Sequence, residues 1–258
     1  MKNVYKTAWS PRAYLTQYYT TPKIAEDEFY ILKFFINFFK NKKLHFDEMI
    51  EVGCGPTIHH ALPFVPYVDK IYMADFLNEN LLEIKKWVSG KSNAHDWNPY
   101  VRGLSQLEWH KQNLATRRTR EFRKKLSGLL KCNIFRASPI GSKKQFGLVT
   151  SFYCLECASQ SKNQWVKSFK NISSLVSQNG WIIVSALRNA KHYLVNKEEF
   201  PATSIRESDI HSALLKNGFS PDTIKIEVHK VGMWESEGFE SILIACAQKR
   251  KQENSLKM

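Results

Sequence analysis

The feature that most constrains the fold is a short apolar segment followed by a glycine-rich turn. Met49–Val52 has the composition of a buried strand and leads directly into Gly53-Cys54-Gly55. Glycines at such a turn let the chain bend tightly and let backbone amides approach a ligand without an obstructing Cβ. The next predicted strand, residues 70–74, precedes Asp75, which follows Gly55 by twenty residues. A carboxylate at that spacing can accept hydrogen bonds from ribose hydroxyls.

The same turn lacks two features of a dinucleotide-binding loop. Ile58 stands where the third glycine of that motif is expected, and Pro56 removes an amide donor that a pyrophosphate would need. The predicted ligand is therefore a nucleoside without phosphates, and S-adenosyl-L-methionine (SAM) fits that description. The alternative interpretation is that the glycines only form a turn and Asp75 only caps a helix.

Beyond this turn, predicted strands and helices alternate along the chain. We expect strands at residues 49–52, 70–74, 132–135, 146–152, 181–186, 223–229 and 240–248. We expect helices at residues 28–39, 79–88, 117–130, 163–176 and 207–217, and one more that begins at Ser10-Pro11. This alternation predicts an α/β fold with a mainly parallel sheet, covered by helices on both faces and ending in a hairpin.

No internal repeat or long linker divides the 258 residues, so we expect a single domain. Residues 1–45 would form a helical N-terminal cap, residues 46–249 the catalytic α/β core, and residues 250–258 a disordered tail. Residues 89–116 would form an extended insertion that covers another part of the molecule. The longest apolar run, residues 29–39, is about half of a membrane span.

Charge and cysteine content bear on partners and location. The five cysteines are an odd number, so we expect reduced thiols in a cytoplasmic protein. We also expect a monomer that has no membrane partner. The net charge is +14, and eleven Lys and Arg residues lie between Lys111 and Lys144 with one acid, Glu121, among them. This segment is either a surface helix with a basic outer face or a face that binds a polyanion.

Several segments resemble one family of small-molecule methyltransferases, which act on nicotinamide, phenylethanolamine, indolethylamine and thioethers. The resembling segments are Trp9–Tyr19, Gly53–Thr57, Ala74–Asn80, Phe152–Glu156 and Asn179-Gly180. The similarity runs from about residue 9 to residue 249. It implies the Rossmann-like, seven-stranded sheet of class I SAM-dependent methyltransferases, with N-terminal helices that close over the site as a lid.

The resemblance also implies a set of cofactor-binding residues. These are Tyr14, Tyr19, Gly53, Gly55, Pro56, Thr57, His59, Asp75, Asn80, Asn133, Ile134 and Phe152. Two of them depart from the commonest family pattern, because His59 replaces a tyrosine and Asn133 replaces an aspartate. An asparagine can still accept a hydrogen bond from the adenine amino group through its carbonyl oxygen.

The substrate side is implied less directly. Glu156 matches an acid of the amine-methylating branch and could accept a proton from an amine, or it could be a strand-end carboxylate that faces solvent. Ser185 occupies the place of a family aspartate. Arg188 could pair with a substrate anion or lie on the surface, and Tyr193 could contact substrate or belong to the core. Glu156 and Tyr14 are the candidate catalytic residues, the latter through cation–π attraction to the sulfonium.

The predicted function is therefore SAM-dependent methyl transfer to the nitrogen of a small amine or heteroaromatic ring. A nucleic-acid methyltransferase that uses the basic 111–144 face is the alternative, and a degenerate, non-catalytic binding protein is a further one. We expect no metal site, because Cys154-x-x-Cys157 lacks a second pair and His59-His60 lacks helical ligand spacing.

Overall fold

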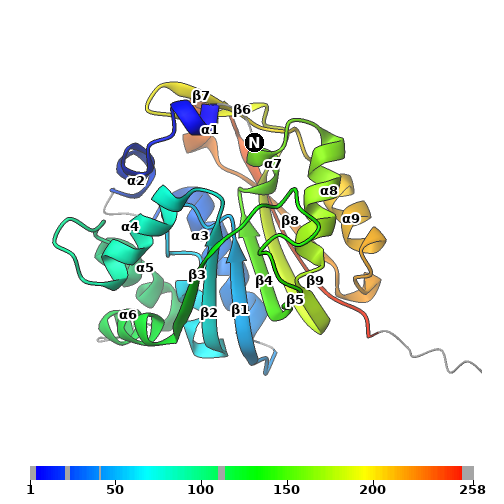
Figure 1. Ribbon diagram of the computed structural model, residues 1–258, viewed down its shortest axis with the longest axis horizontal. Coiled ribbons are helices and arrows are strands. Elements are labelled where there is room, and N and C mark those ends of the chain that lie inside the picture. The colour runs from blue at the N-terminus through cyan, green and yellow to red at the C-terminus, as the bar shows by residue number, and fades with distance from the viewer. Residues whose placement is uncertain (1–3, 21–23, 41, 110–113, 252–258) are drawn as a thin grey trace, which may run out of the picture.

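A mixed, seven-stranded sheet forms the centre of the computed structural model, which describes residues 4–20, 24–40, 42–109 and 114–251 (Figure 1). In spatial order its strands are β3 (Leu126–Lys131), β2 (Val68–Asp75), β1 (Phe46–Val52), β4 (Phe146–Phe152), β5 (Val176–Leu187), β9 (Ser241–Gln248) and β8 (Lys225–Lys230). The first five are parallel, whereas β9 runs antiparallel to both β5 and β8. The predicted fold class and the final hairpin are confirmed.

Helices cover both faces of this sheet, as predicted. The helices are α1 (Val4–Thr7), α2 (Pro11–Tyr19), α3 (Glu26–Lys40), α4 (Asn78–Val88), α5 (Asn98–Trp109), α6 (Leu114–Lys125), α7 (Leu155–Ala158), α8 (Lys162–Ser173) and α9 (Glu207–Lys216). Three 3-10 helices, η1 (Leu62–Tyr67), η2 (Pro221–Thr223) and η3 (Gly232–Glu237), and a small hairpin of β6 (His192–Val195) and β7 (Glu198–Pro201) complete the described elements.

Alternate residues of each strand point to opposite faces, which divides the core in two. Met49 packs with the helices α3 to α6, and its neighbour Ile50 packs with α8 and α9. The N-terminal helix α2 begins as predicted, because the Ser10 hydroxyl accepts a hydrogen bond from the Ala13 amide (3.2 Å) and Pro11 occupies the first turn. Figure 1 shows α1, α2 and the β6–β7 hairpin together over one end of the sheet.

The predicted helix 117–130 and strand 132–135 are wrong. The helix ends at Lys125, and β3 takes up Leu126–Lys131, so that residues 132–135 form a loop. The Lys125 ammonium donates hydrogen bonds to the carbonyls of Val65 (2.9 Å) and Val68 (2.7 Å), which fixes the end of the helix beside the sheet. Leucines at helical spacing in this segment therefore belong to a strand that pairs with β2.

One further expectation differs from the structure. Residues 89–116 do not form an extended insertion, because α5 occupies Asn98–Trp109 and α6 begins at Leu114. The glycine turn after β1 leads into η1, which contains two prolines that cannot donate the hydrogen bonds of a regular helix.

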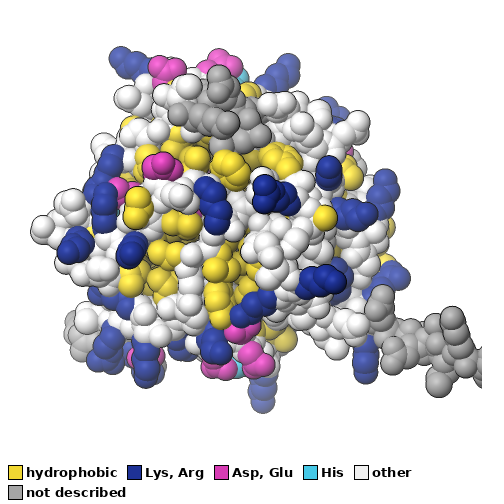
Figure 2. Space-filling view, viewed as in Figure 1, with side chains coloured by type: hydrophobic (Ala, Val, Ile, Leu, Met, Phe, Trp, Pro, Cys, Tyr) yellow, Lys and Arg dark blue, Asp and Glu magenta, His cyan; other side chains and the backbone are white. Residues whose placement is uncertain are grey.

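Some cations of the basic 111–144 segment make contacts within the fold. Arg118 is buried and donates a hydrogen bond to the Leu62 carbonyl (3.0 Å), and the Arg123 guanidinium lies 4.2 Å from the centre of the Trp87 ring. Figure 2 shows Lys and Arg side chains scattered over this face of the molecule, with hydrophobic side chains across its centre. No helix in the described ranges has the length and apolarity needed to cross a membrane.

Candidate active site

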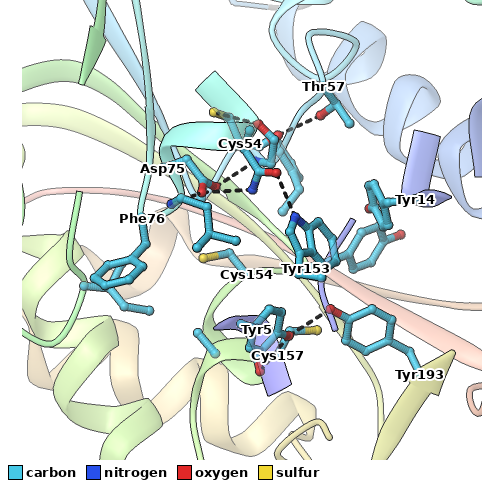
Figure 3. Close-up of a pocket in the computed structure, with 18 of the residues that line it drawn as sticks. Tyr5, Tyr14, Cys54, Thr57, Asp75, Phe76, Tyr153, Cys154, Cys157 and Tyr193 are labelled. Carbon is cyan, nitrogen blue, oxygen red and sulfur yellow. Dashed lines mark hydrogen bonds between the residues drawn. The ribbon is translucent and has the colours of Figure 1, made fainter. Parts of the chain in front are cut away.

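A cavity of about 280 Å³ lies where the parallel strands end (Figure 3). Its floor comes from the carboxyl ends of β2 and β5, which contribute Asp75 and Leu187, and from the loops after β1, β3 and β4, which contribute Gly53, Cys132 and Tyr153. Its remaining walls come from the N-terminal segment and from residues near β6 and β9. Ligands of open α/β sheets bind at this edge, because the carboxyl ends of neighbouring strands converge there.

Asp75 organises one end of the cavity. One of its carboxylate oxygens accepts a hydrogen bond from the Gly55 amide (2.9 Å), and the other accepts from the Leu77 amide (2.7 Å) and the Asn80 side chain (3.0 Å). Burial raises the pKa of Asp75, and these donors oppose that rise. The carboxylate is thus fixed at the strand tip beside the glycine turn, where it can accept hydrogen bonds from a ribose.

Both glycines of the turn have backbone angles that disfavour other residues. Gly53 has a φ of +71°, and a Cβ there would lie 2.0 Å from the Cys154 sulfur. Gly55 has a φ of +59°, and a Cβ there would meet no atom within 4 Å. Gly53 is therefore required for close packing, whereas the surface of Gly55 is open toward a ligand. This bare backbone beside Asp75 fits the nucleoside portion of SAM.

The N-terminal segment forms the aromatic roof of the cavity. The Trp9 indole donates a hydrogen bond to the Asn80 side-chain oxygen (2.9 Å), and the Tyr18 hydroxyl donates to the Leu194 carbonyl (2.6 Å). The Tyr14 ring lies 5.1 Å from both the Trp9 and the Tyr18 rings, measured between centroids. These contacts attach the segment to α4 on one side and to β6 on the other, so that it covers part of the cavity.

A buried cluster of histidines and carboxylates packs against the aromatic residues of the N-terminal segment. The His59 ring donates a hydrogen bond to one oxygen of Glu28, and the His60 ring donates to the other (3.0 Å each). Burial opposes the charged form of His60, but Glu28 and Glu51 outweigh it and raise the His60 pKa to about 9. Burial, aided by the His60 charge, lowers the pKa of His59 to about 4. The two imidazoles hold the Glu28 pKa well below its usual range despite burial.

Glu28, His59 and His60 are also close enough together to hold a metal ion. A metal must displace the imidazole protons, and the raised pKa of His60 means that this site keeps its proton at neutral pH. The carboxylate charge is already balanced by the protonated ring, so the arrangement fits an internal ion pair better than a cation site.

The predicted substrate residues separate into two groups. Tyr193 lines the cavity, and its hydroxyl lies 2.8 Å from that of Tyr5. Arg188 lies outside it and forms an ion pair with Glu207 (3.0 Å). Ser185 is buried on β5 behind the wall.

Glu156 is fully buried, so the solvent-facing interpretation is wrong. One of its oxygens accepts a hydrogen bond from the Leu187 amide (2.9 Å), and the other has no hydrogen-bond partner within the described part of the chain. Burial raises the Glu156 pKa to about 7. Its neighbours Cys157 and Leu187 line the cavity, so this carboxyl group lies directly behind the wall.

Most of the predicted cofactor residues meet at the cavity. Those that line it are Tyr14, Tyr19, Gly53, Gly55, Thr57, Asp75, Asn80, Asn133, Ile134 and Phe152. Pro56 and His59 do not, because Pro56 is buried in the turn and the His59 ring packs behind Tyr19, at 4.5 Å between centroids. The Asn133 side-chain oxygen accepts a hydrogen bond from the Phe135 amide (3.0 Å), so it is partly used within its own loop.

Sequence analysis missed several residues that line the cavity. These are Tyr5, Trp9, Tyr18, Asp27, His60 and Tyr153. The signal for Asp27 was present, since it is an acid in the first turn of an otherwise apolar helix. Tyr153 gave no such signal, because its position depends on a left-handed backbone conformation (φ 50°) that turns the chain after β4.

Comparisons with known proteins agree with this geometry. The profile of the NNMT/PNMT/TEMT family matches residues 1–250. Human nicotinamide N-methyltransferase is 24% identical over 250 residues, 94% of each chain, and mouse indolethylamine N-methyltransferase is 25% identical over 227 residues, 83% of each chain. N-methyltransferase NodS from Bradyrhizobium japonicum, solved with S-adenosylhomocysteine, has a TM-score of 0.52 at 10% identity, and the match covers 97% of this chain and 100% of NodS.

The sheet order and the cavity at its strand ends are those of the class I SAM-dependent methyltransferase fold. Family membership narrows this class further. The chain belongs to the NNMT/PNMT/TEMT family, and SAM is its cofactor.

Proposed function

We propose that this enzyme transfers the methyl group of SAM to a nitrogen atom of a small-molecule amine or heteroaromatic acceptor. The observation that carries the proposal is the aromatic cavity that joins the Asp75 carboxylate at one end to Asp27 at the other, with the buried Glu156 behind its wall. Its volume suits small ligands, and an N-methylating activity is named for each relative described above.

At the cofactor end, Asp75 would accept hydrogen bonds from the ribose, while the loop at Asn133 and Ile134 would flank the adenine. Gly53 and Gly55 would leave room for the backbone of the turn to approach the cofactor. Tyr14 and Tyr19 would face the sulfonium, whose positive charge is attracted to aromatic faces. Burial keeps both phenols protonated, because it raises their pKa values well above neutrality.

At the acceptor end, the chain's main tasks are to position the nucleophile and to exclude water. SAM supplies an activated methyl group, so in-line displacement needs little further chemistry from the protein. The roof formed by Trp9, Tyr14 and Tyr18 would exclude water from the acceptor nitrogen. Glu156, with a pKa of about 7, would take up the proton that this nitrogen releases. Its place behind the wall requires that a water molecule or a side-chain rotation completes the path.

Two measurements test the proposal on the full-length protein. Calorimetry should detect S-adenosylhomocysteine binding, and methyl transfer should appear in a panel of pyridines and arylalkylamines but not in matched alcohols. Failure to bind S-adenosylhomocysteine, or transfer to the alcohols alone, would refute the proposed function.

The role of Glu156 has its own test. Glu156→Gln should lower kcat by about 100-fold and leave S-adenosylhomocysteine affinity within about twofold. The wild-type rate should rise with pH through about 7, because the base must be deprotonated, and this rise should vanish in the variant. Glu79→Gln, which alters an exposed acid on α4, serves as the control. An unchanged kcat with an unchanged pH profile would contradict the role.

We further propose that the protein acts as a cytoplasmic monomer. All five cysteines are free thiols, which suits a reducing compartment. Nucleic acid is the less favoured acceptor, because Arg118, Arg123 and Lys125 are engaged in contacts within the fold.

A further inference from the structure

The aromatic end of the cavity carries a carboxylate to which the proposed function assigns no role. Asp27 lies in the first turn of α3, is 6% exposed, and lines the cavity. The Tyr153 hydroxyl donates a hydrogen bond to it (3.2 Å), which places Asp27 at the acceptor end. Figure 3 shows Tyr153 and Tyr14 on the far side of Cys154 from Asp75 and Phe76. The two carboxylates that line the cavity, Asp75 and Asp27, therefore lie at opposite ends of it.

The surroundings of Asp27 favour a positively charged ligand group. The lining residues within the described ranges include neither Lys nor Arg, and the charge of the lining His60 is balanced by Glu28 and Glu51. The adjacent Glu28 is committed to His59 and His60, and Glu156 lies behind the wall. Asp27 is thus the acid that faces this end of the cavity, among aromatic faces that also attract cations. Burial strengthens the attraction between its carboxylate and a cation.

Tyr153 is held in an unusual backbone conformation that serves this contact. Its φ of 50° is left-handed, which is uncommon for a residue other than glycine. Its amide donates a hydrogen bond to the Ser185 carbonyl (3.3 Å), and its ring projects toward α3. A strained residue maintained at a ligand cavity is typical of a functional position.

We propose that Asp27, positioned by Tyr153, binds a protonated nitrogen of the acceptor that is separate from the nitrogen that receives the methyl group. A nitrogen held as an ammonium ion has no lone pair and cannot attack the methyl group, so the nucleophile must be a second, neutral nitrogen. The acceptor class is then an amine or heteroaromatic base that carries an additional ammonium group. This inference rests on the proposed function and adds that the acceptor carries an ammonium group besides the nitrogen that is methylated.

The test measures binding of a matched pair of probes to the enzyme saturated with S-adenosylhomocysteine. 4-(Aminomethyl)pyridine carries the ammonium beside a ring nitrogen, and 4-(hydroxymethyl)pyridine replaces it with a neutral hydroxyl group. We expect the amine to bind at least about tenfold more tightly, and we expect Asp27→Asn to abolish the preference. Asp27→Asn should leave S-adenosylhomocysteine affinity within about twofold. Tyr153→Phe should reduce the preference partially.

Glu26→Gln is the matched control, because it removes a neighbouring acid from the same helical turn that does not line the cavity. It should retain the full preference. Equal binding of the two probes by the wild type, or a preference that survives Asp27→Asn, would overturn the proposal. A tenfold loss of S-adenosylhomocysteine affinity in Asp27→Asn would also overturn it, since the carboxylate would then hold the ammonium of the cofactor. Methyl transfer to other amines by the wild type does not depend on any of these outcomes, so the proposed function is judged separately.

Discussion

Protonation of His60 should make the stability of this enzyme fall as the pH rises above neutrality. His60 has a pKa of about 9 in the folded chain, against about 6.5 for an unperturbed histidine. Between these values the folded state binds a proton that the unfolded state has lost, so each increase in pH favours unfolding. At 1.36 kcal/mol per pKa unit, the shift corresponds to about 3 kcal/mol, present below pH 6.5 and lost as pH passes 9.

The perturbation is His60→Gln, which keeps a hydrogen-bond donor for Glu28 but removes the titrating ring. Urea denaturation followed by tryptophan fluorescence gives the unfolding free energy of both proteins at pH 6.5 and 9.5. Titrating groups outside the cluster of Glu28, Glu51, His59 and His60 are common to both proteins, so their effects cancel in the difference. We expect the wild type to exceed the variant by about 3 kcal/mol more at pH 6.5 than at pH 9.5. His211→Gln, which alters an exposed ring on α9, should show no such change.

A difference that stays constant to within about 1 kcal/mol between the two pH values would refute the reasoning. If His60→Gln fails to fold, nuclear magnetic resonance of the wild type replaces the comparison. The His60 ring signals should then titrate near pH 9, and a midpoint below 7 would show that Glu28 and Glu51 do not hold the ring in its charged form.

Two further predictions concern the cofactor end and the basic segment. Asp75→Asn should weaken S-adenosylhomocysteine binding by about 100-fold in calorimetry, because a neutral amide accepts hydrogen bonds less strongly than the carboxylate. The control Asp69→Asn, which alters an exposed acid, should have no effect on this binding. A loss of affinity below threefold in Asp75→Asn would contradict the ribose assignment. Arg118→Met should lower the unfolding free energy by about 1–3 kcal/mol in urea, because the Leu62 carbonyl loses its donor, whereas exposed Arg117→Met should change it by less than about 0.5 kcal/mol. Equal effects of the two arginines would show that the contact is unimportant.

The cofactor end of the cavity was predictable because its parts depend on local patterns. A strand, two glycines and an acid at the tip of the adjacent strand determine most of the geometry around Gly55 and Asp75. The parallel pairing of Val52 with Ala74 follows from the same two apolar runs. Such features need only short-range sequence information and the general rule that ligands bind at the carboxyl ends of parallel strands.

The acceptor end was not predictable in the same way. Glu28 meets His60 across 32 residues of sequence, and Tyr153 meets Asp27 across 126. No periodicity connects these positions, because α3 reaches them only after it packs on the sheet. The predicted end of the helix at residue 130 was wrong for a different reason. Leucines three and four residues apart fit either a helix or a short buried strand, and the structure ends the helix at Lys125.

The hydrogen bond between Trp9 and Asn80 has a consequence for the order of events in turnover. Asn80 also donates to Asp75, so one side chain joins the N-terminal segment to the carboxylate that we propose binds the ribose. If docking of the N-terminal segment increases the affinity for the nucleoside, then binding of the nucleoside must stabilise the docked segment by the same free energy. The acceptor would therefore bind to a cavity whose N-terminal segment is already docked by the cofactor. Release of the demethylated cofactor would weaken that docking and so favour release of the methylated product.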